Sequence, residues 1–168
     1  MVNDQTMQTL PRLDVYMLGV YVQPSGIPDM PRPLQPGKVC AAPFHNWWYR
    51  AVTVQYYAEE DEVLVKLADY GGYLRLPRSD LRQIRTDFVS LPFQAVECYL
   101  AHVEPIDGTT KWSEDAFALF SSLIGERNLE CYVVGYSIDD SKPVVELFAT
   151  DDNNRVSIPH FAYFFFEI

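Results

Sequence analysis

Residues 38–77 read KVCAAPFHNWWYRAVTVQYYAEEDEVLVKLADYGGYLRLP, and the pattern in these residues predicts the fold class. It holds short runs rich in β-branched and aromatic residues at 38–44, 48–57, 62–70 and 73–77. The turn sequences HN, AEEDE and DYGG separate these runs. Short strands that recur about every ten residues and are joined by tight turns are typical of a small closed barrel. Closure of the barrel also removes exposed sheet edges.

The segments that flank this stretch predict a helix and two connectors. Residues 10–21 carry apolar side chains at spacings of three and four, which predicts an amphipathic helix with Pro11 near its first turn. The proline-rich residues 22–37 predict an extended linker. Residues 79–88 predict a short helical or 3₁₀ connector with Ser79 as its N-cap.

The C-terminal half predicts a second group of strands and helices. Ser113, followed by two acidic residues, predicts the start of a helix. Its expected apolar face consists of Phe117, Phe120, Leu123 and Ile124. The other expected elements are a strand in 93–105, a hairpin of 129–138 with 144–150, and a short helix in 157–168 with Pro159 in its first turn.

Composition and charge narrow the class of protein. The chain has 168 residues, 48% of them hydrophobic, which is enough to fill a core. Its formal charge of -10 disfavours a phosphate backbone as a ligand and favours basic ligands such as arginine-rich segments. Binding of single-stranded RNA by aromatic stacking is therefore the weakest of the possible functions.

The cysteines and acidic residues indicate neither a metal site nor an active site, and the termini indicate no targeting segment. Cys40, Cys98 and Cys131 lie far apart and outside any metal-binding spacing, which favours a reducing compartment. The sequence has no signal-peptide pattern and no apolar run long enough to cross a membrane. The acidic residues lack the paired basic residues and the nucleophile–base motif of an active site. We expect no enzyme activity, no metal and no cofactor.

The motif G-x-x-C-x-A-x-F at 37–44, then WYRA at 48–51 and DYG at 69–71, resembles a Tudor domain. Together with residues 81–105 and WSEDAFALF at 112–120, the chain resembles the extended Tudor type. This resemblance implies a mainly β fold with helices, in which an SH3-like Tudor β-barrel is joined to an incomplete staphylococcal-nuclease-like OB-fold subdomain. The implied domains are a linking helix and linker at 1–37, the barrel at 38–88 and the nuclease-like subdomain at 89–168.

CAAPFHNWWYRA, ADYGGY and LRQIRTDFVSLPFQA are similar to the Tudor region of the mitochondrial A-kinase anchoring family. The similarity implies a protein-interaction module of a kinase-anchoring scaffold, at the cytosolic face of the mitochondrial outer membrane. Extended Tudor domains place two strands before the linking helix, and we expect this chain to lack a counterpart of them. We therefore expect an open sheet edge in the second subdomain, which makes a homodimerisation module an alternative function.

The resemblance also implies an aromatic cage for methylated arginine at Phe44, Tyr49, Leu67, Tyr70 and Gly72. Ring faces attract a poorly hydrated cation, but leucine has no aromatic quadrupole and glycine has no side chain to bond a guanidinium. We therefore expect that the cage is degenerate and that methylarginine binding is weak or lost. The alternative is a functional methylarginine reader.

Several residues around the cage have a second interpretation. Tyr49 and Tyr70 are equally well explained as ordinary barrel residues that pack their rings and keep their hydroxyls wet. Trp47 or Tyr73 could take over part of the missing contact. For Arg50 with Asp69 we favour a structural ion pair or turn bond over any role in binding.

Overall fold

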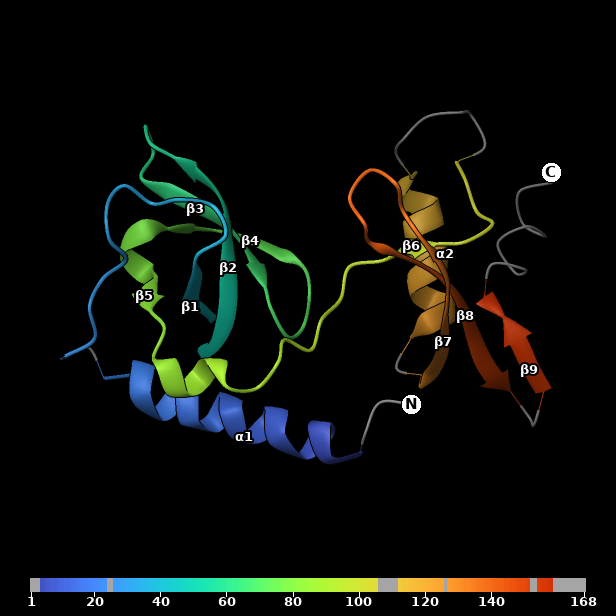
Figure 1. The fold of residues 1–168 in the computed structure, drawn as a ribbon, viewed down its shortest axis with the longest axis horizontal. Helices are drawn as coiled ribbons and strands as arrows, with labels where there is room; N and C mark the ends of the chain where they lie inside the picture. The colour runs from blue at the N-terminus through green and yellow to red at the C-terminus, as the bar shows by residue number, and fades with distance from the viewer. Residues whose placement is uncertain (1–3, 24–25, 106–111, 126, 152–153, 159–168) are drawn as a thin grey trace. The chain divides into compact units, whose positions relative to one another are not determined.

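The computed structural model describes most of the chain, which divides into two compact units, Met1–Val96 (unit 1) and Glu97–Ile168 (unit 2) (Figure 1). Among the described residues the fold is mostly strands, with two α-helices. The described residues are 4–23, 26–105, 112–125, 127–151 and 154–158.

Unit 1 is an SH3-like barrel of antiparallel strands, as the sequence predicted. The strands follow the order β4-β3-β2-β1-β5. Along β3 the residues alternate between inward and outward positions, so that Val63, Val65 and Leu67 are buried. A register shift between Thr53 and Gln55 interrupts the pairing of β2 with β3. The bounds are β1 Val39–Phe44, β2 Trp47–Tyr57, β3 Glu62–Leu67, β4 Tyr73–Pro77 and β5 Arg82–Gln83.

Two tight turns place the ends of these strands. His45 and Asn46 both have positive φ, of 47° and 64°, which suits the two-residue hairpin between β1 and β2. Between β3 and β4, Gly71 and Gly72 have φ of 74° and 78°. In this turn Leu67 donates its N–H to the Gly72 carbonyl at 3.1 Å, and Gly71 donates to the Leu67 carbonyl at 3.2 Å.

The barrel core extends into the proline-rich linker. Cys40, Val63, Val65 and Leu81 are fully buried together with small alanines. The predicted linker contributes Met30 and Leu34 to this core, so part of it is packed against the barrel. Burial raises the pKa of the Cys40 thiol to about 12, which keeps it protonated and unreactive.

Helix α1, Asp4–Tyr21, packs on the barrel beside the turn η2, Thr86–Val89 (Figure 1). Met17 and Tyr21 are buried, and the Tyr21 ring stacks on Trp48 with centroids 5.3 Å apart. The Tyr21 hydroxyl donates to the Gln83 carbonyl and accepts from the Arg85 N–H, each at 3.0 Å. These contacts fix the helix to the barrel.

Two details of the predicted helical segments are wrong. Because α1 begins before residue 10, Pro11 lies inside the helix and not in its first turn. The connector contains the turn η1, Arg78–Asp80, followed by β5 and η2. Ser79 lies inside η1 and caps nothing, because Pro77, with a fixed φ of -53°, stands at the N-cap position.

A buried ion pair attaches residues 88–95 to the barrel. Arg50 pairs with Asp69, with Nε–Oδ2 at 2.8 Å, and the two residues are 1% and 9% exposed. The same guanidinium donates to the backbone carbonyls of Phe88, Leu91 and Pro92. Asp69 in turn accepts from the Gln94 N–H at 3.2 Å. The structural ion pair favoured from the sequence is thus confirmed.

Unit 2 is a small sheet with one helix. Strand β8 pairs with β6 in parallel and with β7 and β9 in antiparallel fashion, and β7 with β8 forms the predicted hairpin. Ser113 caps α2, since its Oγ accepts from the Ala116 N–H at 3.1 Å. The bounds are β6 Tyr99–Leu100, α2 Glu114–Ile124, β7 Leu129–Tyr136, β8 Pro143–Asp151 and β9 Asn154–Ser157.

Unit 2 departs from the predictions at two places, and a third prediction is untested. The predicted strand in 93–105 is reduced to Tyr99–Leu100, because the residues before it are bonded to the barrel of unit 1. On α2, Phe117 is 70% exposed, so of the predicted apolar face Phe120, Leu123 and Ile124 are partly buried, as are Ala116 and Leu119. Residues 159–168 of the predicted last helix lie outside the described residues.

Candidate functional site

Three of the five predicted cage residues lie together at one end of the barrel. Phe44 ends β1, Tyr49 lies on β2 and Tyr70 lies in the turn after β3. The ring centroids of Phe44 and Tyr49 are 6.5 Å apart, and those of Tyr49 and Tyr70 are 5.2 Å apart. We call these residues the aromatic cluster.

The rings of the aromatic cluster form a corner that is open to solvent. Tyr49 and Tyr70 meet edge to face at 80°, and Phe44 is tilted by 59° to Tyr49. Phe44 is 37% exposed and Tyr70 is 54% exposed, while Tyr49 is half-buried. Rings at such angles act as adjacent walls, and a cation can be held against their faces.

Leu67 belongs to the barrel core. It is 6% exposed and clusters with Val63, Val65 and the other buried residues of the barrel. Tyr49 packs against this same core cluster from its rim. Leu67 therefore supports the aromatic cluster through packing and offers no ring face.

Gly72 is exposed and lies in the turn next to Tyr70. Its carbonyl accepts the Leu67 N–H, and a Cβ built at this position meets nothing within 4 Å. The backbone of Gly72 thus stabilises the turn, but this position supplies no polar side chain to a ligand.

The structure adds a residue that the sequence reasoning missed. Asp14 of α1 accepts a hydrogen bond from the Tyr70 hydroxyl through its Oδ2. Asp14 precedes Met17 and Tyr21 at spacings of three and seven, so it shares the helix face that packs on the barrel. An acidic residue on the apolar face of an expected amphipathic helix was the available signal.

The Asp14 carboxyl influences the electrostatics of the cluster. Its pKa is raised mainly by burial and further by the like charge of Asp69, against the Tyr70 hydrogen bond and the Arg50 charge, which lower it. Burial and then the Asp14 charge raise the pKa of Tyr49. Burial and the bond to Asp14 raise the pKa of Tyr70. Both tyrosines therefore stay protonated and neutral near neutral pH.

Further aromatic side chains flank the cluster. Trp47 pairs across the hairpin with Phe44 and is 39% exposed, and Tyr73 at the start of β4 is 53% exposed. The His45 ring lies against Phe44, with centroids 4.0 Å apart. The surface around the cluster is thus aromatic over a wider area than the cluster itself.

Comparison with known proteins identifies the family. The family model for the Tudor domain matches residues 2–102. The chain is 52% identical over 147 residues to the KH domain-containing protein akap-1 of Caenorhabditis elegans, covering 88% of this chain and 17% of that protein. It is 40% identical over 154 residues to mitochondrial A-kinase anchor protein 1 of Mus musculus, covering 91% and 18% respectively. The chain thus spans less than a fifth of the length of these relatives.

Solved structures give the same fold. The extended Tudor domain of human TDRD1, in complex with a symmetrically dimethylated peptide, matches with a TM-score of 0.82 and 28% identity, covering 97% of this chain and 78% of that one. A variant of the Drosophila melanogaster Papi extended Tudor domain, in complex with an unmethylated Piwi N-terminal peptide, matches with a TM-score of 0.76 and 29% identity, covering 91% and 83%.

Tudor domains are non-catalytic binding modules, and the SH3-like barrel found here is the part that the family model matches. Within the described residues, no helix has the length and hydrophobicity needed to cross a membrane. The sequence, the barrel and the structural neighbours agree on one assignment: the chain belongs to the Tudor domain family and has the extended Tudor fold, a protein-interaction module similar to that of A-kinase anchoring scaffolds.

Proposed function

We propose that this domain docks arginine-bearing protein segments on the aromatic cluster and that methylation of the arginine does not strengthen binding. One observation carries the proposal: Phe44, Tyr49 and Tyr70 form an open corner, while Leu67 is in the core and Gly72 has no side chain. The structural neighbours include a Papi variant in complex with an unmethylated or a symmetrically dimethylated peptide and TDRD1 in complex with a symmetrically dimethylated peptide, which supports a peptide as the ligand.

The energetics of the corner agree with this ligand. A cation over an aromatic face gains roughly 0.5–2 kcal/mol, so the three rings can hold the guanidinium of an unmodified arginine. A leucine in place of a ring removes one such contact, and a glycine removes the hydrogen bond that orients a planar guanidinium. The formal charge of -10 adds long-range attraction for basic segments without regard to methylation.

Calorimetric titration tests this function. Short Gly-Arg-Gly repeat peptides would carry arginine in the unmodified, monomethylated, symmetrically dimethylated or asymmetrically dimethylated form. We expect binding that is no tighter for the dimethylated peptides, and loss of binding in Tyr70→Ala. Tyr136→Ala, which removes a 69% exposed tyrosine of unit 2, is the matched control. Tighter binding of a dimethylated peptide by a factor of about ten would identify a methylarginine reader instead.

We further propose that the domain serves a kinase-anchoring scaffold at the cytosolic face of the mitochondrial outer membrane. The name of the mouse relative, a mitochondrial A-kinase anchor protein, supports this location. Protease treatment of intact mitochondria that carry the full-length protein would test it. The domain should be degraded without rupture of the outer membrane, and protection would contradict the proposal.

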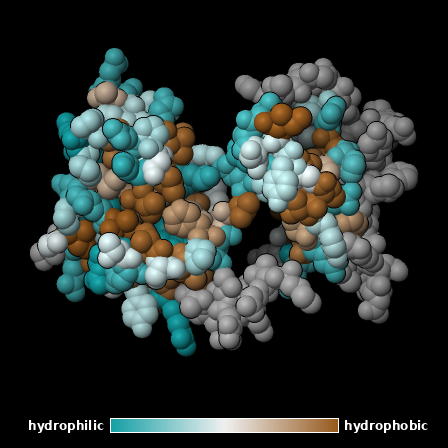
Figure 2. Space-filling model, viewed as in Figure 1, coloured by the Kyte–Doolittle hydropathy of each residue, from teal (hydrophilic) through white to brown (hydrophobic). Residues whose placement is uncertain are grey.

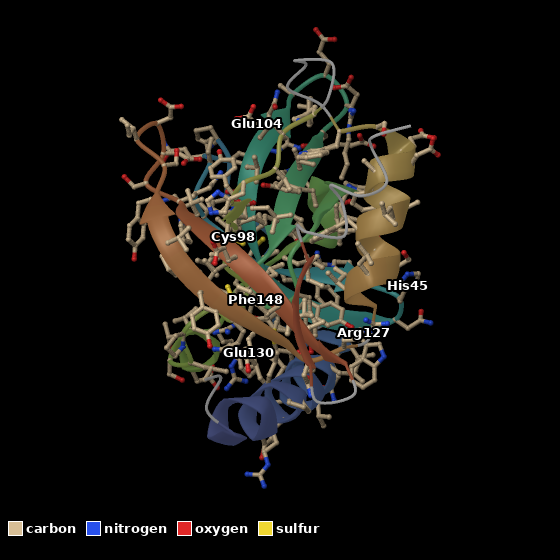
Figure 3. The ribbon with its side chains drawn as sticks, turned by 90° about the vertical axis from the view of Figure 1, so that its right-hand side faces the viewer. His45, Cys98, Glu104, Arg127, Glu130 and Phe148 are labelled. Atoms are coloured by element: carbon tan, nitrogen blue, oxygen red, sulfur yellow. The ribbon has the colours of Figure 1, made fainter. Side chains whose placement is uncertain are left out.

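Self-association is a second candidate, favoured by the sheet of unit 2. Figure 3 looks onto this sheet, where β7 forms the edge beside β8; within the described residues β8 is its pairing partner. Val133 and Val134 on β7 are 55% and 51% exposed, and hydrophobic residues (brown) reach the surface of both units in Figure 2. An unpaired apolar edge can pair with a second copy. Sedimentation over a dilution series would reveal a dimer that dissociates in Val133→Lys, and a monomer throughout would exclude it.

A further inference from the structure

The carboxylate of Asp14 lies beside the aromatic cluster. Its Oδ2 accepts from the Tyr70 hydroxyl, and it acts on Tyr49 through its charge. Among the side chains that the structure describes, the basic group that acts on it is Arg50, whose guanidinium is already bound to Asp69 and three carbonyls. Within this part of the chain, the negative charge of Asp14 is therefore left without an ion-pair partner.

The position of Asp14 is set by the fold. Met17 and Tyr21 hold α1 on the barrel, and the Tyr21 hydroxyl bonds both Gln83 and Arg85. Asp14 lies one helical turn before Met17 on the same face, so its carboxyl is brought to the rim of the barrel. The site is thus built from α1, β1, β2 and the turn after β3.

We infer that Asp14 is the anionic arm of the site and makes it selective for arginine with an unmodified guanidinium. The inference rests on the proposed function. A carboxylate accepts up to about four hydrogen bonds, so Asp14 can keep its bond to Tyr70 and receive two parallel N–H groups from a guanidinium. The rings of Tyr70 and Tyr49 then hold the guanidinium plane from the side.

Methylation of the arginine weakens the contact between its guanidinium and the Asp14 carboxylate. It preserves the positive charge but replaces N–H donors, and it blocks bidentate bonding to a carboxylate. Lysine keeps the charge as well, but it has no planar fork that can bond both carboxylate oxygens. An aromatic corner with a carboxylate therefore ranks unmodified arginine above dimethylated arginine and above lysine.

A variant that removes the charge of Asp14 distinguishes the contribution of the carboxylate to binding from that of the aromatic rings. Asp14→Asn keeps an oxygen that accepts from Tyr70 but loses the charge and the second acceptor. Asp80→Asn, at an exposed acidic residue of η1, removes the same charge elsewhere on unit 1 and is the matched control. The probes are Gly-Arg-Gly repeat peptides, unmodified or symmetrically dimethylated, and the same repeat with lysine.

The expected result is a change of selectivity. Asp14→Asn should weaken binding of the unmodified arginine peptide at least about tenfold and change the dimethylated peptide little, while Asp80→Asn changes both slightly and equally. Asp14→Glu, which keeps the charge, should retain the preference for unmodified arginine. Thermal melting would verify that each variant is folded.

The outcomes separate the two proposals. If Tyr70→Ala abolishes binding while Asp14→Asn leaves the affinities unchanged, the proposed function is supported and the inferred role of Asp14 in selectivity is overturned. Equal weakening by Asp14→Asn and Asp80→Asn, or equal weakening of both arginine peptides, would reduce Asp14 to bulk charge and overturn the inference. If the unaltered chain binds none of the peptides, both proposals fall.

Discussion

Two residues at the turn after β3 differ in their roles. Leu67 packs in the barrel core, whereas Gly72 lies at the surface beside the aromatic cluster. Leu67 is buried among core residues, so replacing it changes barrel stability as well as the site. Gly72 has open space around it, so a side chain there can be tested without a clash. Introducing a polar side chain at position 72 therefore tests the missing ligand contact more directly than replacing Leu67 does.

We predict that Gly72→Asn increases affinity for a symmetrically dimethylated arginine peptide. Asparagine tolerates the positive φ of 78° better than most residues, and its amide can bond a guanidinium from the rim. A stability cost of about 1–2 kcal/mol is expected from the left-handed backbone. Gly71→Asn, at φ 74° in the same turn, is the matched control. If calorimetry gave equal affinities for the two variants, a missing side chain at position 72 would not explain weak binding.

We predict that Asp14→Asn stabilises the fold near neutral pH while it weakens arginine binding. The pKa of Asp14 is raised in the folded state from its ordinary 3.8, so the folded state holds the proton more tightly than the unfolded state. The resulting stability is present below pH 3.8 and is lost as pH rises through the folded-state pKa. At neutral pH the ionised carboxyl therefore costs stability, mainly through burial.

The unfolding free energy as a function of pH checks this sign. Denaturant titrations at neutral pH should show a higher midpoint for Asp14→Asn than for the unaltered chain, and the difference should shrink in acid. The groups that act on Asp14 are Tyr70, Asp69 and Arg50, and Asp80→Asn again serves as the control. A lower midpoint at neutral pH would mean that the carboxylate stabilises the fold.

Among the secondary-structure elements, the sequence correctly predicted those that depend on neighbouring residues. The alternation in β3 and the polar turns indicated the barrel strands, and the Ser113 cap indicated the start of α2. Contacts between distant residues were not visible: 56 residues separate Asp14 from Tyr70. The expected strand in 93–105 was shortened because Asp69 and Ala68 bond the backbone of Gln94 and Ala95. Periodicity alone does not reveal such competition for backbone groups.

We predict that Arg50→Lys destabilises unit 1 by about 3 kcal/mol or more, because a lysine cannot satisfy both Asp69 and the three carbonyls of residues 88, 91 and 92. Amide exchange at Ala95, which donates to the Ala68 carbonyl, should accelerate. Arg75→Lys, in an exposed pair with Glu62, should change stability by less than about 1 kcal/mol. Similar destabilisation by both substitutions would contradict a special role for the buried pair.

At the scale of the whole molecule, the aromatic cluster and Asp14 lie entirely in unit 1. This unit has two hydrophobic clusters of its own, one inside the barrel and one under α1. Its last residues are fixed by Arg50 and Asp69, so its boundary after Val96 follows the hydrogen bonds. Independent folding needs such a core and few broken contacts at the cut.

We therefore predict that a fragment of residues 1–96 unfolds cooperatively and keeps the peptide preference of the full chain. A fragment of residues 1–88 is the matched control, because it removes Leu91 and Pro92, whose carbonyls accept from the buried Arg50 guanidinium, and Gln94, whose N–H bonds Asp69. An uncompensated buried charge is strongly destabilising, so the shorter fragment should fail to fold. Circular dichroism melts and peptide titration would compare the two. If residues 1–96 fold but do not bind, unit 2 must supply part of the site, and selectivity could not be explained by Asp14 and the aromatic cluster alone.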